Sequence, residues 1–119
     1  MSITYREIKD QYNALVKTFT ELDRQQEEIR DFFRNVKAQS LLCVGSGSSF
    51  CLCRSAEMTA RIRLGMASSA LTAGDLMLNY QASAKILSQA LMLIPPRSGN
   101  TSEILMAIEA CRSITRPAV

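Results

Sequence analysis

Three short apolar runs, each followed by a helical pattern, constrain the fold of this chain more than any other feature. The first run, SLLCV, is bounded by GSGSS, as a buried strand would be. The strands are expected at residues 40–44, 67–73 and 90–94. The helices are expected at residues 50–64, with Gly65 at the C-terminus, at 76–87 after Gly74 and Asp75, and at 102–111. This alternation predicts an α/β fold, in which helices cover both faces of an open parallel sheet.

Residues 1–39 form a separate helical segment in this interpretation. Between residues 8 and 36 the apolar side chains fall alternately four and three positions apart, except at Gln26. The spacing predicts one amphipathic helix, or two with a break near Arg24, with a coiled-coil-like seam. Such a seam fits a dimerisation helix and a helix packed on its own domain equally well. The following domain, 40–119, ends in SITRPAV, which predicts a C-terminally incomplete sheet with an open edge.

The composition narrows the possible functions. The 119 residues carry a net charge of +3, which is too weak and too scattered to indicate a nucleic-acid partner. The chain has no histidine, which excludes a Ser-His-Asp triad and an HExxH zinc site, and no metal is expected. Four cysteines without C-x-x-C spacing and a charged start indicate a cytoplasmic protein with reduced thiols. No apolar run approaches the length of a membrane helix.

Two loops rich in glycine and hydroxyl groups follow the first and third expected strands. GSGSS follows the first strand, and PPRSGNTSE follows the third. In a parallel sheet built from right-handed crossovers both loops lie at one edge, where ligands bind. The helix N-terminus after each loop offers unpaired N–H groups to an anion, and Ser and Thr hydroxyls add further donors. The two loops therefore predict a phosphate site.

Helix capping is the alternative explanation of both loops. Asn100 could cap the last helix, with Glu103 three residues later as in a capping box. Ser48 or Ser49 could cap the earlier helix in the same way. Two loops of the same composition at one predicted edge favour anion binding over capping.

Nucleotide cofactors do not fit the sequence. Gly45-x-Gly47 begins like a dinucleotide fingerprint, but Phe50 stands at the third glycine position, where close packing of helix on strand needs glycine. No G-x-x-x-x-G-K-[ST] motif occurs. No cofactor is therefore expected.

Three motifs in this order give the chain a family resemblance: VGSGSSF at 44–50, AGD at 73–75 and SGNTSE at 98–103. With them, nearly the whole chain resembles the sugar isomerase (SIS) domain of phosphosugar isomerases and phosphosugar-binding proteins, including the isomerase domain of glucosamine-6-phosphate synthase. The resemblance implies a flavodoxin-like three-layer αβα sandwich with a parallel sheet.

The resemblance also implies a set of site residues. The phosphate ligands would be Gly47, Ser48, Ser49, Arg97, Ser98, Gly99 and Thr101. Pro96 replaces the first serine of the family's S-x-S-G-x-T loop, which removes a hydroxyl group and a backbone N–H group. Arg97 either compensates as a charged donor or is a solvated side chain. Asp75 and Glu103 are possible sugar contacts, and Glu57 is expected to be a surface or pairing residue.

The function implied is that of the phosphosugar-binding domain of an aldose–ketose isomerase or deaminase-isomerase. Its ligand would be a hexose phosphate or amino-hexose phosphate, and the protein would be a homodimer without a metal or organic cofactor. The family's acid-base groups come largely from a second repeat and a C-terminal segment, so no catalytic residue is assigned and little turnover is expected from this chain alone. One alternative is a non-catalytic sugar-phosphate sensor or interaction module. Another is a structural helix-mediated dimer in which Pro96 has abolished binding.

Overall fold

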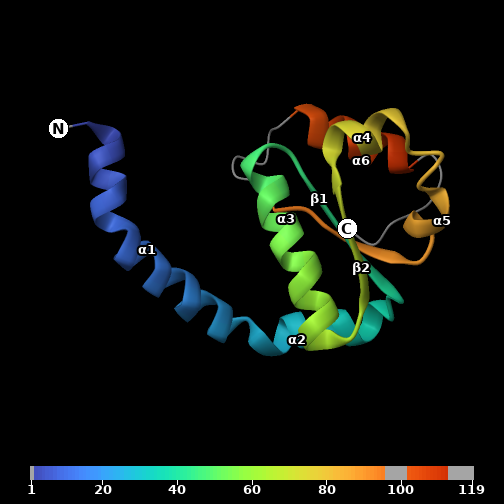
Figure 1. Ribbon diagram of the computed structural model, residues 1–119. Coiled ribbons are helices and arrows are strands. Elements are labelled where there is room, and N and C mark those ends of the chain that lie inside the picture. Colours follow the sequence, from blue (N-terminus) through green and yellow to red (C-terminus); the bar gives the residue numbers. More distant parts are fainter. Residues whose placement is uncertain (1, 96–101, 113–119) are drawn as a thin grey trace. The chain divides into compact units, whose positions relative to one another are not determined.

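The structure of the protein, a computed structural model, describes residues 2–95 and 102–112 (Figure 1). The chain divides into two compact units, Met1–Lys37 (unit 1) and Ala38–Val119 (unit 2). Within the described ranges, no helix is both long and apolar enough to cross a membrane.

Unit 1 consists of the helices α1 (Ile3–Arg24) and α2 (Gln26–Val36). The side chain of Ser2 accepts a hydrogen bond of 3.3 Å from the backbone N–H group of Tyr5 and so caps the start of α1. The helical geometry is interrupted at Gln25, where ψ is 3°. Of the two predicted possibilities, the break near Arg24 is therefore confirmed.

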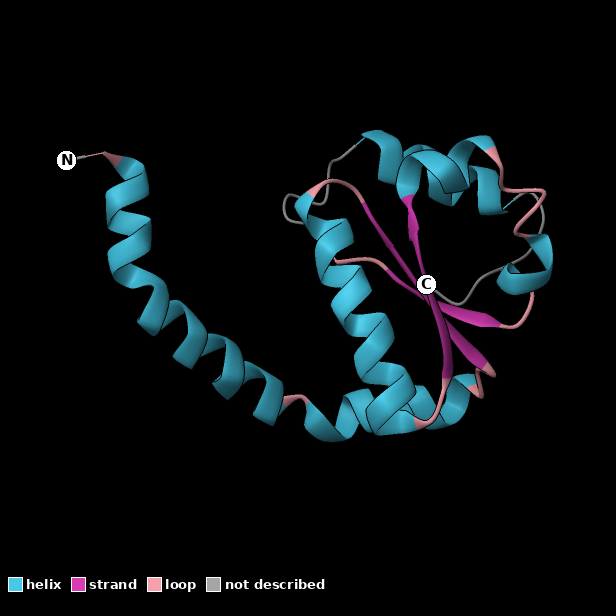
Figure 2. Ribbon diagram, viewed as in Figure 1, coloured by secondary structure: helices cyan, strands magenta, loops and turns pink. Residues whose placement is uncertain are grey.

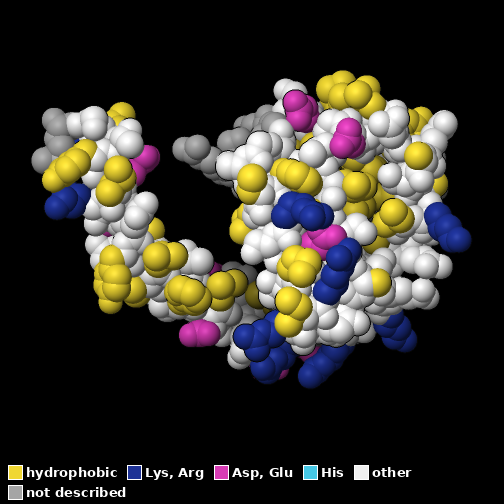
Figure 3. All heavy atoms as spheres, in the orientation of Figure 1, with side chains coloured by type: hydrophobic (Ala, Val, Ile, Leu, Met, Phe, Trp, Pro, Cys, Tyr) yellow, Lys and Arg dark blue, Asp and Glu magenta, His cyan; other side chains and the backbone are white. Residues whose placement is uncertain are grey.

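The apolar seam of α1 is exposed within unit 1. Figure 3 shows hydrophobic side chains following α1 along its length. The seam consists of Ile8, Tyr12, Leu15, Phe19 and Leu22, all of them exposed. Neither helix of unit 1 has a buried residue. α2 therefore does not cover the seam of α1.

Unit 2 is built on three parallel strands, β1 (Ser40–Gly45), β2 (Ala67–Thr72) and β3 (Ala90–Leu93), as Figure 2 shows. Their order in the sheet is β2-β1-β3. Leu42 of β1 lies opposite Ser69 of β2 and Met92 of β3. The predicted parallel sheet is confirmed, with strand ends that differ from the expected ones by one residue.

Helices cover both faces of this sheet (Figure 1). α3 (Ser48–Thr59) packs on β1 and β2 on one face. α4 (Ala73–Leu78), α5 (Ala84–Leu87) and α6 (Ser102–Arg112) cover the other face. The predicted α/β class and its three-layer αβα arrangement are confirmed.

The two faces of β1 have different cores. The side facing α4, α5 and α6 is apolar, and its buried cluster consists of Leu42, Val44, Ala73, Leu76, Leu87, Met92, Ile104, Ala107 and Cys111. The side facing α3 contains the thiols of Cys43 and Cys53 and the carboxylate of Glu57. Burial, and then the negative charges of Cys53 and Glu57, raise the pKa of Cys43 to about 11.

The helix expected at 50–64 begins earlier and changes its winding. It starts at Ser48 and runs as α3 to Thr59, after which the chain continues as the π-helix η1 (Ala60–Leu64). Gly65 then takes a left-handed conformation, with φ 59°, and ends the helix as predicted.

The single helix expected at 76–87 is wrong, because α4 and α5 are separate. The residues between them turn through hydrogen bonds of the i to i+3 type, from the N–H group of Ala82 to Asn79 O and from that of Ser83 to Tyr80 O. Gly74 and Asp75, expected to precede the helix, lie in the first turn of α4.

Candidate functional site

The turn after β1 has a conformation that requires glycine at its second position. Gly47 has φ 57° and ψ −126°, and the carbonyl of Ser46 accepts a hydrogen bond of 3.2 Å from the N–H group of Ser49. These are the features of a type II′ turn. Any residue with a side chain would be strained at the second position of such a turn. The turn leads directly into α3.

Gly45, the last residue of β1, is required by close packing. A Cβ atom at this position would lie 2.6 Å from the backbone carbon of Ser49 and 2.7 Å from the backbone nitrogen of Phe50. The start of α3 therefore presses against the end of β1. Glycine is thus required at two positions of GSGSS for different reasons. Gly45 allows close packing at the end of the strand, and Gly47 allows the backbone conformation of the turn.

Several hydrogen-bond donors at this turn have no partner within the described residues. The hydroxyl groups of Ser48 and Ser49 make no side-chain hydrogen bond there, and the N–H groups of Gly47 and Ser48 have no acceptor. The N-cap residue of α3 is Gly47, which makes no side-chain cap bond. The alternative in which Ser48 or Ser49 caps this helix is therefore wrong, and the donors are available to an anion.

A side-chain hydrogen bond joins this turn to the start of α6. The hydroxyl group of Ser46 donates to a carboxylate oxygen of Glu103 at 2.9 Å. The two residues are 57 positions apart in the sequence, so the bond brings the start of the first loop next to the end of the third. Sequence reasoning did not single out Ser46, because nothing local in the sequence predicts this contact.

Asp75 lies at the same edge of the sheet, at the carboxyl end of β2. Thr72, the last residue of β2, caps α4 by accepting a hydrogen bond of 3.1 Å from the N–H group of Asp75. The residue is exposed, and its carboxylate makes no hydrogen bond within the described part of the chain. The predicted position of Asp75 at the carboxyl edge agrees with the structure.

The third loop is described at its two ends, by β3 and by Ser102 of α6. The following residues of the prediction lie outside the described residues: Pro96, Arg97, Ser98, Gly99, Asn100 and Thr101. The expected capping box of Asn100 and Glu103 is not tested, because Asn100 is one of these residues.

Glu57 lies inside unit 2, away from this turn, and is 4% exposed. Its two carboxylate oxygens accept hydrogen bonds of 2.6 Å from Arg54 and 2.6 Å from Arg61. The expectation of a pairing residue is correct, whereas a surface position is wrong. No group of three or more Cys, Asp or Glu residues in the described ranges could hold a metal ion.

No protein-family model matches this chain, and no curated protein matches it. Among solved structures, the chain is similar to tagatose-6-phosphate ketose/aldose isomerase from Escherichia coli, with a TM-score of 0.83 and 22% sequence identity. The alignment covers 96% of this chain and 32% of the isomerase chain. The chain thus has the fold of about a third of that ketose/aldose isomerase, which agrees with the fold implied by the resemblance to SIS domains.

Proposed function

We propose that the carboxyl edge of unit 2 binds the phosphate group of a hexose phosphate or amino-hexose phosphate. The observation that carries this proposal is the turn at residues 45–49, which ends a buried strand, begins a 12-residue helix and has unclaimed N–H and O–H donors. A phosphate group can accept all of these bonds, and the N-terminal end of the helix dipole stabilises its charge.

The third loop would complete the phosphate site from the opposite side. The bond between Ser46 and Glu103 supports this arrangement, because it ties the first turn to the helix that follows the third loop. The predicted ligands there remain Arg97, Ser98, Gly99 and Thr101. Thr and Ser hydroxyls and an arginine side chain are suitable donors to phosphate oxygens.

The sugar would extend from the phosphate towards the carboxylates at this edge. Asp75 and Glu103 are exposed there and can accept hydrogen bonds from sugar hydroxyl groups. Both also carry negative charge, which opposes a phosphate group placed close to them. We therefore assign the phosphate to the donors of the α3 turn and the sugar hydroxyls to the carboxylates.

The reaction class follows from the fold neighbour and is part of the proposal. An aldose–ketose isomerase moves a proton between adjacent carbons, for which it needs a positioned acid or base. The chain spans 32% of the length of the similar isomerase, and none of its residues is assigned that role here. We infer that this chain supplies the phosphosugar-binding part, with little turnover alone.

A thermal-shift titration tests the binding proposal. The wild-type chain is titrated with fructose 6-phosphate, glucosamine 6-phosphate and unphosphorylated fructose. The Ser49→Ala variant tests the turn, and Ser55→Ala, an exposed serine later in α3, is the matched control. A ligand that binds the native state raises the melting temperature. The proposal expects a rise with the phosphates alone, lost in Ser49→Ala and kept in Ser55→Ala, whereas equal responses of both variants would overturn it.

A coupled assay on the same samples separates the enzyme from its alternative. Conversion of fructose 6-phosphate would place a catalytic group within the chain. Binding without conversion supports a binding domain and is the result expected of a sugar-phosphate sensor as well.

We also propose that the chain forms a homodimer through the seam of α1. The seam residues follow the alternating four- and three-residue spacing of a coiled coil, and Tyr12 and Phe19 are 77% and 64% exposed. Burying such side chains in a partner helix is favourable. Light scattering should show a dimer for the wild type and a monomer for Phe19→Glu. Val16→Glu, an exposed apolar position off the seam, should stay dimeric, and monomeric wild-type protein would contradict this proposal.

A further inference from the structure

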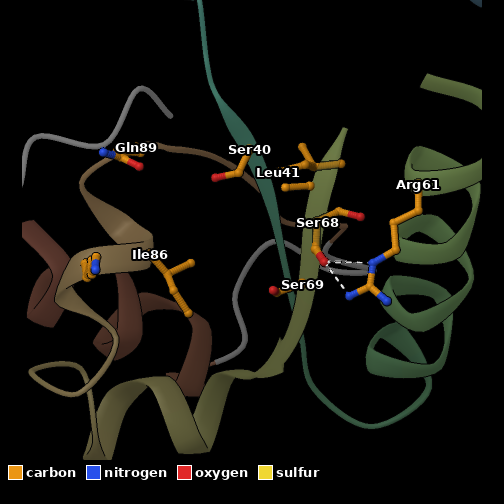
Figure 4. Close-up of a pocket in the computed structure, with 9 residues that line it drawn as sticks. Ser40, Leu41, Arg61, Ser68, Ser69, Ile86 and Gln89 are labelled. Atoms are coloured by element: carbon orange, nitrogen blue, oxygen red, sulfur yellow. Dashed lines mark hydrogen bonds between the residues drawn. The ribbon is translucent and has the colours of Figure 1, made fainter. Parts of the chain in front are cut away.

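A pocket of about 400 Å³ opens at the amino ends of the strands, opposite the turn that carries the proposed phosphate site (Figure 4). Ser40, the first residue of β1, and Ser69 of β2 contribute to its wall. Lys85 and Ile86 of α5 and Arg61 of η1 also line it. The pocket thus combines residues from both faces of the sheet at one end.

Lys85 gives this pocket a positive charge, whereas the charge of Arg61 is paired with Glu57. Arg61 and Lys85 line it, and no acidic side chain does. Lys85 is exposed and makes no ion pair within the described residues. Arg61 donates through Nε and Nη2 to the carbonyl of Ser68, at 3.2 and 2.7 Å, and through Nη2 to Glu57. These bonds hold Arg61 against β2 and Glu57, on the side of β2 away from Ser40 and Ser69 (Figure 4).

Two serines stand where the face of the sheet is otherwise apolar. Ser40 and Ser69 share the face of Leu42, which packs in the apolar cluster under α4, α5 and α6. Figure 4 shows both hydroxyl groups directed towards the side of the strands on which Ile86 lies. Neither hydroxyl makes a side-chain hydrogen bond within the described residues, in contrast to Ser68, which donates to the carbonyl of Glu57 at 2.8 Å. The two hydroxyls therefore add neutral donors to the ammonium group of Lys85.

We propose that this pocket binds a small dianion, a phosphate or dicarboxylate, separately from the site at the carboxyl edge. Lys85 would offset part of its charge, and Ser40 and Ser69 would donate to its oxygens. Ile86 offers an apolar wall to the carbon part of an organic anion. The inference does not depend on the proposed phosphosugar site, because the two sites share no residue.

Backbone amide NMR of the full chain, titrated with inorganic phosphate and with succinate, tests this site. The expected result is saturable shifts of the amides at residues 40, 67–69 and 85–89, with either probe or both. Lys85→Gln should weaken this binding by about tenfold, as expected when one charged hydrogen bond is lost. Lys17→Gln, an exposed lysine of α1, is the matched control and should leave it unchanged.

The same spectra keep this proposal separate from the carboxyl-edge site. Shifts at residues 47–49 alone would overturn the amino-edge site while supporting the other one, and shifts at both edges would support both. Shifts at the amino edge that do not saturate, or that Lys85→Gln leaves unchanged, would also overturn it. A preference for phosphate over succinate, or the reverse, identifies the ligand class.

Discussion

The two ends of the sheet each hold a glutamate that bridges elements, and the two are bonded in different ways. At the amino end, Glu57 is 4% exposed and uses both carboxylate oxygens on arginines. At the carboxyl end, Glu103 is exposed and accepts one hydrogen bond, from Ser46. Glu57 therefore connects α3 to β2 through Arg61, which bonds to Ser68. Glu103 connects α6 to the turn after β1 through a single exposed hydrogen bond.

The Glu57 network is structural, whereas the turn after β1 has donors that are free to bind a ligand. A buried carboxylate must be paired, so Glu57 and its arginines have no bonding capacity on the carboxylate side for a ligand. At the carboxyl end, Ser48 and Ser49 have unclaimed hydroxyl groups beside a helix N-terminus. Changes in the Glu57 network should act on stability first, and changes at the Ser48–Ser49 turn on binding first.

The largest expected effect on stability is that of removing Glu57. Glu57→Ala should lower the free energy of unfolding by about 2 to 3 kcal/mol, because two charged hydrogen bonds are lost while the half-exposed arginines regain water. Glu103→Ala should cost less than about 1 kcal/mol, as exposed contacts do. Urea denaturation of both variants measures the difference, and equal losses would contradict the comparison.

Gly45→Ala should have the next largest effect. It should lower the free energy of unfolding by about 2 kcal/mol and abolish phosphate binding. Its Cβ atom would meet the backbone of Ser49 and Phe50, which must move, and the start of α3 moves with them. Gly74→Ala is the control, because its Cβ meets nothing within 4 Å and α4 should tolerate it. Calorimetric titration with fructose 6-phosphate checks both. Unchanged binding in Gly45→Ala would show that the turn is not part of the site.

Alkaline pH should weaken the α3 face of the sheet. Burial raises the pKa of Cys43 from its ordinary value of 9.0 to about 11, so the native state holds this proton more tightly than the unfolded chain. The contribution is full below pH 9 and is lost as the pH rises to about 11, at about 1 kcal/mol per pH unit. Urea denaturation at pH 8 and 10 should show a steeper loss for the wild type than for Cys43→Ala. Equal slopes would contradict this assignment.

The smallest expected effect is that of Glu103→Gln on phosphate affinity. The amide can still accept the hydrogen bond from Ser46, and one negative charge near the proposed phosphate is removed. Binding should therefore become tighter, by about threefold at low salt, and the gain should fade as salt screens the charge. Calorimetry at two salt concentrations measures this. The titration uses inorganic phosphate, which has no sugar hydroxyl groups, and weaker binding of it in Glu103→Gln would contradict this prediction.

The strands and the loops could be predicted from the sequence, because a short apolar run or a glycine in a turn determines structure within a few residues. Gly65 ended its helix as expected, and the Gly-Ser turn lies at the carboxyl edge. The burial of Glu57 was missed, although Arg54 and Arg61 stand three and four positions from it on the same helical surface, a signal that was available.

Contacts between distant segments could not be predicted in this way. The bond between Ser46 and Glu103 joins residues 57 positions apart, and the amino-edge pocket takes residues from both faces of the sheet. Such arrangements depend on how the elements pack. The sequence pattern therefore predicted the positions of the two loops but not the hydrogen bond between Ser46 and Glu103 that connects them.

The most direct test of the central claim, phosphate binding by the α3 turn, is a calorimetric titration of the chain with fructose 6-phosphate. The double variant Ser48→Ala/Ser49→Ala and the control Ser55→Ala are measured beside the wild type. The account predicts saturable binding by the wild type and the control, no binding of unphosphorylated fructose, and a loss of at least about tenfold in the double variant. Binding of equal strength in the double variant, in a chain that remains folded, would contradict it.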